Sequence, residues 1–187
     1  MPFSSGRYYP DANLGNVFIG TTAIAGVNPP AYNATAHTFC VWNPLGSGKN
    51  IIPIHLMLGW SATTNATGNV VISYQNGVGA QVATGAAITA ATLVAPLNAK
   101  LGAGNSSVAK FAPATITFAA ATSLLMTTGL TQTVIAATDA TNLLKQAKHD
   151  FEGTLSVPPG SAICVAGNIA LLGAYDITLI WGEVPVT

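Results

Sequence analysis

Hydrophobic and polar residues alternate over short stretches of this chain, which is the pattern of β-strands. These stretches are rich in Val, Ile, Thr and aromatic residues, and Gly, Pro, Asn and Ser separate them. The pattern predicts about nine or ten strands, and 123–128 is expected to pair with 114–119. The predicted strands are 17–24, 35–43, 50–60, 69–75, 87–94, 114–119, 123–128, 151–157, 161–166 and 175–183.

Helical periodicity is scarce. The best candidate is 139–149, where Asp139 is a suitable N-cap and Leu143, Leu144 and Ala147 form a short apolar face. Many strands with at most a short helix predict an all-β sandwich or barrel. The long excursion between strands at 77–110 favours a jelly-roll-like β-sandwich over a simple meander.

Two parts are expected, an N-terminal arm at 1–15 and a single domain at 16–187. The arm carries four large apolar side chains together with several Pro and Gly residues, so we expect an extended segment and no helix. Such an arm either lies on a neighbouring subunit or capsid, or packs on its own domain. Its apolar residues are Phe3, Tyr8, Tyr9 and Leu14.

Charged residues are unusually few, at 6% of the chain, and the formal net charge is zero. The segments 50–99 and 111–138 contain none. A nearly neutral surface promotes association, so we expect much of it to be covered by other subunits. The alternative is a Thr- and Asn-rich surface that simply stays soluble. The six acidic residues are interpreted as surface or subunit-contact charges.

Membrane and nucleic-acid partners are not expected. The mean hydropathy is +0.48, but the strongest apolar run, 51–60, contains Pro53 and His55 and is too short to span a bilayer. The N-terminus has no apolar signal region, so we expect assembly in a cytoplasm. Six basic residues balanced by six acidic ones give no electrostatic footprint for nucleic acid.

No catalytic residue, cofactor or metal ion is predicted. The segment 43–50 (NPLGSGKN) departs from the phosphate-loop spacing at both ends and precedes a strand. Residues 149–152 offer acid–base groups without a nucleophile motif. Cys40 and Cys164 are expected to be buried free thiols. The spacing of His37 and Cys40 suits a metal, but the other soft ligands, His55, His149 and Cys164, are not expected to cluster with them.

The segments 151–165 (FEGTLSVPPGSAICV) and 176–183 (DITLIWGE) form a strand, a Pro-Pro-Gly turn, a strand, a loop and a final strand. This stretch resembles the closing strands of jelly-roll proteins from tailed-phage virions, including trimeric capsid decoration (cement) proteins. The turn at 43–50 resembles a turn between two strands in proteins of the same group. The resemblance covers 35–75 and 150–187. It implies a homotrimer located in the virion that binds and stabilises the major capsid protein shell.

Two other functions remain open. The same fold occurs in tail, fibre and baseplate components, and jelly rolls also serve as carbohydrate-binding modules. A carbohydrate site would need exposed aromatic side chains, and five residues could supply them. These are Tyr8, Tyr9, Trp42, Trp60 and Trp181.

Assembly contacts are expected from two regions, the N-terminal arm and 50–75. Apolar residues in the second region occur on both faces of the predicted strands, which indicates an apolar face beyond the core of the domain. The candidate contacts are Phe3, Tyr8, Tyr9, Leu14, Ile54, Leu56, Leu58 and Tyr74.

Overall fold

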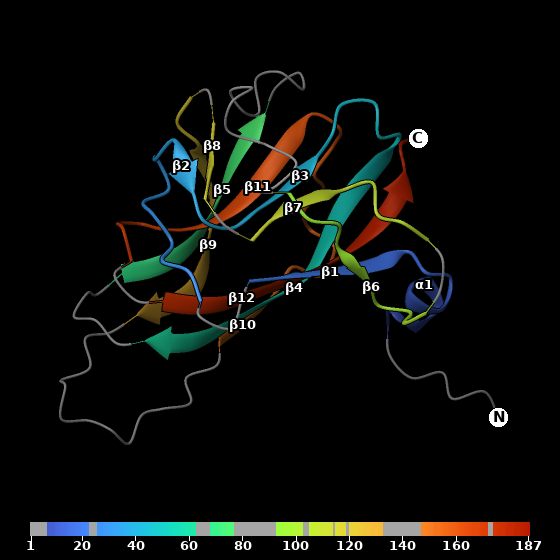
Figure 1. The fold of residues 1–187 in the computed structure, drawn as a ribbon, viewed down its shortest axis with the longest axis horizontal. Helices are drawn as coiled ribbons and strands as arrows, with labels where there is room; N and C mark the ends of the chain where they lie inside the picture. Colours follow the sequence, from blue (N-terminus) through green and yellow to red (C-terminus); the bar gives the residue numbers. More distant parts are fainter. Residues whose placement is uncertain are drawn as a thin grey trace.

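The chain forms a sandwich of two antiparallel β-sheets with five strands each, and a third, two-stranded sheet lies beside them (Figure 1). The computed structural model describes residues 7–22, 26–62, 68–76, 93–102, 105–113, 115–118, 120–132, 147–171 and 174–187. Nearly all regular structure in the described residues is β-strand, and the single helix among them has five residues. The predicted all-β fold is therefore confirmed.

Each sheet combines strands that lie far apart in the sequence. The first sheet has the order β10 (Ala147–Asp150), β4 (Lys49–Ala62), β12 (Ala174–Pro185), β1 (Val17–Thr21) and β6 (Leu97–Asn98). The second has the order β7 (Lys110–Ala112), β3 (Cys40–Asn43), β11 (Ser161–Gly167), β5 (Gly68–Asn76) and β9 (Ser123–Gln132). The small sheet pairs β2 (Ala36–His37) with β8 (Ile116–Thr117).

Eight of these strands follow a nested pairing order. β1 pairs with β12, β3 with β11, β4 with β10, and β5 with β9, all antiparallel. Taken in chain order, the first strand therefore pairs with the last, the second with the seventh, the third with the sixth and the fourth with the fifth. The other strands of the two large sheets, β6 and β7, come from the segment between β5 and β9 and extend one sheet each.

The main hydrophobic core fills the space between the two large sheets. β12 alternates buried and half-buried residues from Ala174 to Glu183, as expected for a strand with one face on the core. Phe18, Leu56 and Trp181 of the first sheet meet Val41 and Ile163 of the second. Burying a side chain of this size stabilises the fold by about 1.5–3 kcal/mol.

A second hydrophobic cluster lies on the outer face of the second sheet. Because successive side chains alternate across a strand, Val41 and Ile163 point into the main core while Cys40 and Cys164 point away from it. The small β2–β8 sheet lies over this outer face and contributes Ile116 to the cluster. Every residue of β11 is buried as a result.

Most predicted strands are present. Those at 17–24, 50–60, 69–75, 161–166 and 175–183 correspond to β1, β4, β5, β11 and β12. The predicted strand 123–128 is part of β9, but it pairs with β5 and not with 114–119; among the described residues of 114–119, Ile116–Thr117 form a strand. The predicted strand 35–43 is interrupted between β2 and β3. Most of 87–94 lies outside the described residues.

Two sequence predictions in the second half of the chain are wrong. Segment 151–157 is not a strand, because Glu152 and Gly153 adopt positive φ values of 51° and 75° and only Val157 bridges to Ile51. The helix predicted at 139–149 is wrong at its C-terminal end, because 147–149 belong to strand β10 and His149 pairs with Leu56. Tertiary pairing overrides the weak helical pattern there, and 139–146 lie outside the described residues.

Residues 7–15 of the predicted arm are not extended. Tyr9–Asn13 form the helix α1, with a proline in its first turn, where the missing N–H costs no hydrogen bond. Asn105 Nδ2 donates to the Leu14 carbonyl at 2.9 Å, and Asn98 Nδ2 donates to the Gly15 carbonyl at 2.8 Å. Residues 7–15 thus pack on their own domain. In the part of the chain described, no helix is long and apolar enough to span a membrane.

Candidate functional site

Cys40 and Cys164 form a disulfide bond within the second cluster. They face each other directly in the pairing of β3 with β11, with Cα atoms 4.1 Å apart, and both side chains are 1% exposed. The predicted burial is confirmed, whereas the predicted free thiols are wrong. The two residues are 124 positions apart, so only the register of the sheet reveals that they are neighbours.

His37 lies beside this disulfide and is fully buried. Its Nε2 is 3.1 Å from the Ala34 carbonyl and 2.9 Å from the Thr122 hydroxyl, and burial lowers the pKa of the ring. A ring nitrogen of His37 and the two sulfur atoms all lie within 4.8 Å of one another. The expectation that no further soft ligand accompanies His37 and Cys40 is therefore wrong.

Glu183 forms a buried polar centre between β12 and the segment before β7. Its carboxylate accepts hydrogen bonds from Lys49 Nζ at 3.2 Å, the Val108 N–H at 3.0 Å and the Ala109 N–H at 3.3 Å, and also from the Ser107 hydroxyl. Because Glu183 is only 3% exposed, its interpretation as a surface charge is wrong. The network anchors 107–109 to the first sheet.

The acid–base groups at 149–152 do not form one site. Asp150 pairs with His55 Nδ1 on β4 and with Lys148 Nζ at 3.0 Å. The hydrogen bond from Lys148 is the largest cause that lowers the pKa of Asp150. His149 instead packs edge-on against Phe151, because neighbouring residues of β10 point to opposite faces.

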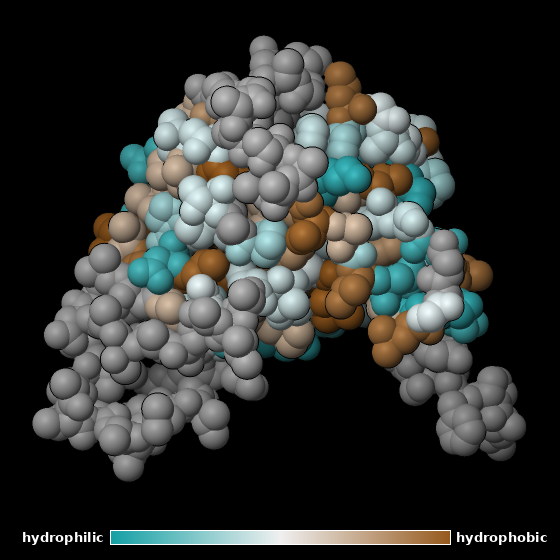
Figure 2. Space-filling model, in the orientation of Figure 1, coloured by the Kyte–Doolittle hydropathy of each residue, from teal (hydrophilic) through white to brown (hydrophobic). Residues whose placement is uncertain are grey.

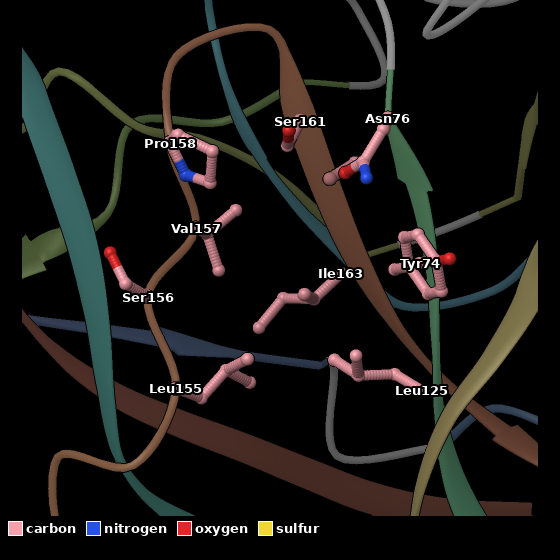
Figure 3. A pocket seen from close by; sticks show the side chains of 10 residues that line it. Tyr74, Asn76, Leu125, Leu155, Ser156, Val157, Pro158, Ser161 and Ile163 are labelled. Atoms are coloured by element: carbon pink, nitrogen blue, oxygen red, sulfur yellow. The ribbon is translucent and has the colours of Figure 1, made fainter.

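A pocket of about 290 Å³ opens beside β11. Figure 3 shows Tyr74 and Leu125 on one side, Leu155 and Pro158 on the other, and Ile163 between them. Its polar groups come from Tyr74, Asn76, Ser156 and Ser161. None of the described residues that line it is acidic or basic, so these residues suit a neutral ligand. The full lining is Tyr74, Asn76, Leu125, Leu155, Ser156, Val157, Pro158, Ser161, Ala162 and Ile163.

Three of the predicted assembly contacts are buried within the chain. Leu56 and Leu58 belong to the main core, and Ile54 is 4% exposed in a small cavity beside Tyr8. The pairing of β12 with β4 skips Ile54, and this irregularity explains why apolar residues occur on both faces of β4. The expected exposed apolar face along β4 is therefore wrong.

The other predicted contacts have varied positions. Tyr8 is half-buried with its ring 5.7 Å from that of His55, Leu14 is 64% exposed, and Tyr74 is half-buried in the pocket beside β11. Tyr9 is part of α1, and Phe3 lies outside the described residues.

An exposed apolar edge escaped the sequence analysis. Leu97 on the edge strand β6 is 63% exposed, and Leu101 in the turn that follows is 87% exposed. The backbone of Leu14 and Gly15 runs beside this edge, because Asn105 donates to the Leu14 carbonyl and Asn98 to the Gly15 carbonyl, and the Leu14 side chain is 64% exposed. Figure 2 shows a strip of hydrophobic side chains on this face, over the region where β6 and β7 lie in Figure 1. Leu14, Leu97 and Leu101 are called the β6 edge below.

The tryptophan side chains offer little for a carbohydrate site. Trp181 is completely buried in the main core, and Trp42 is half-buried against the second cluster. The side chain of Trp60 lies outside the described residues.

Comparison with protein-family models, with curated protein sequences and with solved structures gives no match.

Proposed function

We propose that this chain is a virion structural protein with a jelly-roll fold, which decorates the head of a tailed phage by binding its major capsid protein. The nested pairing of eight strands carries this proposal. A jelly roll has eight strands in two packed sheets and is common in viral capsid proteins. The resemblance of 35–75 and 150–187 to virion jelly rolls supports the same conclusion.

The protein acts as a homotrimer in this proposal. The β6 edge exposes Leu14, Leu97 and Leu101, and Lys100 is the one charged residue between positions 50 and 109. Several exposed apolar side chains in one region of a surface mark an association site. A closed symmetric oligomer buries the same patch on every subunit and leaves no unpartnered copy.

Binding to capsids tests the proposed function. Purified protein is mixed with phage heads that lack it, the heads are pelleted, and the bound protein is counted per capsid subunit. We expect saturable binding that protects the heads against heat. Electron micrographs with labelled protein should show the label on the heads. Binding confined to tails would favour the fibre or baseplate alternative, and no binding to virions of the source would contradict both.

A carbohydrate-binding module is the second candidate, because the pocket beside β11 combines the Tyr74 ring with Asn76 and two serine hydroxyls. An aromatic ring with neutral hydrogen-bonding groups suits a sugar. Binding of the protein to a glycan array, abolished by Tyr74→Ala and unchanged by Tyr32→Ala, would support this candidate. An array without bound protein would eliminate it.

A further inference from the structure

We propose that His37, Cys40 and Cys164 bind one zinc ion when the disulfide is reduced. The three side chains come from three neighbouring strands. β2 supplies the imidazole of His37, and β3 and β11 supply the sulfurs of Cys40 and Cys164. A donor atom from each residue lies within 4.8 Å of the other two. All three side chains are no more than 1% exposed, and the zinc site is independent of the proposed virion function.

The hydrogen bonds of His37 leave one ring nitrogen available to a metal. The Ala34 carbonyl only accepts, so Nε2 carries the proton and donates to it at 3.1 Å. The Thr122 hydroxyl donates to the Tyr32 carbonyl and accepts from Nε2. In the neutral ring Nδ1 therefore holds a lone pair, and it is buried with no hydrogen-bond partner among the described residues. A metal-ligating histidine commonly donates its other N–H to a carbonyl in this way.

The required movement is small. Zinc binds thiolate sulfur at about 2.3 Å and imidazole nitrogen at about 2.0 Å, so ligand atoms around one zinc lie roughly 3.5–3.8 Å apart. Once the S–S bond is broken, rotation of the two cysteine side chains separates the sulfurs to this distance without moving the paired strands. The backbone positions of Cys40 and Cys164 are fixed by the register of β3 with β11.

Charge favours a divalent cation. Two thiolates and a neutral imidazole carry a charge of −2, which Zn²⁺ neutralises and Cu⁺ does not. Because the surrounding cluster is formed by Ala112, Ile116, Phe118 and Ala162, a net charge there would be costly. Soft thiolate ligands also favour zinc over magnesium or calcium.

The disulfide and the zinc site exclude each other. A phosphine reductant with one water molecule converts the disulfide to two thiols and becomes a phosphine oxide. Zinc then displaces the two thiol protons. In an oxidising environment the disulfide links β3 to β11, and in a reducing one the metal would link β2 to both of these strands.

Titration of the full chain with Co²⁺ and then Zn²⁺ tests the site, since cobalt bound to thiolate absorbs in the near ultraviolet. After reduction with a phosphine, we expect one cobalt per chain, displaced by zinc, and a higher unfolding temperature with zinc. The oxidised protein should bind none. If reduction unfolds the chain, zinc should restore the β-sheet circular dichroism.

Matched variants locate the ligands. Cys40→Ser combined with Cys164→Ser should abolish the absorption band of cobalt bound to thiolate. His37→Gln should weaken metal binding at least tenfold, whereas His149→Gln should bind the metal as the parent does. The oxidised His37→Gln protein gives a folding control, because its disulfide is intact. Absence of metal binding by the reduced parent, failure of zinc to restore an unfolded reduced chain, or unchanged affinity in His37→Gln would overturn the proposal.

Discussion

Two hydrophobic clusters lie on opposite faces of the same sheet and are held together by different means. The main core between the sheets is large and apolar, with Phe18, Leu56 and Trp181 among its fully buried members. The second cluster beneath β2 and β8 is small and surrounds the disulfide, with buried His37 beside it. The second cluster buries little apolar surface, and the disulfide within it links β3 to β11 beneath the small sheet.

The largest loss of stability is expected in the main core. Trp181→Ala removes a completely buried indole and leaves a cavity, so it should lower the free energy of unfolding by about 3–5 kcal/mol. Trp42→Ala, at the half-buried edge of the second cluster, should cost clearly less. Urea unfolding followed by tryptophan fluorescence and circular dichroism measures both. Equal losses in the free energy of unfolding would show that the two clusters contribute equally to stability.

The disulfide gives the next largest effect. Replacing both cysteines by alanine removes a link across 124 positions and should cost about 2–5 kcal/mol under oxidising conditions. In the presence of a reductant and a chelator, the parent should lose most of its additional free energy of unfolding relative to the variant. Unfolding curves of parent and variant under both conditions give the comparison. A parent that is no more stable than the variant when oxidised would contradict the structural role of the link.

A smaller effect is expected from the polar part of the second cluster. Thr122→Val removes the hydroxyl that bonds to the Tyr32 carbonyl and to His37 Nε2, at a cost of about 1–2 kcal/mol. Thr127→Val on the exposed face of β9 is the control and should change stability by less than about 0.5 kcal/mol. Hydrogen exchange should quicken in β2 and β8 of the Thr122 variant and not in β4.

Sequence patterns predicted the main strands well because the core strands alternate clearly. β12, with its regular alternation of buried and half-buried residues, is the best example. Features that depend on register were missed. The Cys40–Cys164 bond, the buried carboxylate of Glu183 and the irregularity at Ile54 each need a partner from a distant strand. Helix α1 was not predicted because the Pro and Gly residues of 1–15 argue against a helix, although Pro10 suits a first turn.

The β6 edge should contribute least to the fold and most to assembly. Leu97→Glu and Leu101→Glu should change the free energy of unfolding of a subunit by less than about 0.5 kcal/mol, because both side chains are exposed. They should nevertheless separate the subunits by placing like charges in a shared interface. Leu45→Glu, at another exposed leucine in the turn between β3 and β4, is the matched control and should leave assembly intact.

The mass of the purified protein in solution tests the assembly account most directly. Light scattering at micromolar concentration should give three times the 18.9 kDa of the chain, unchanged by moderate salt, and Leu97→Glu should reduce it to that of one chain. A monomeric mass for the parent protein at every salt concentration would contradict the proposed homotrimer and would favour the carbohydrate-binding alternative.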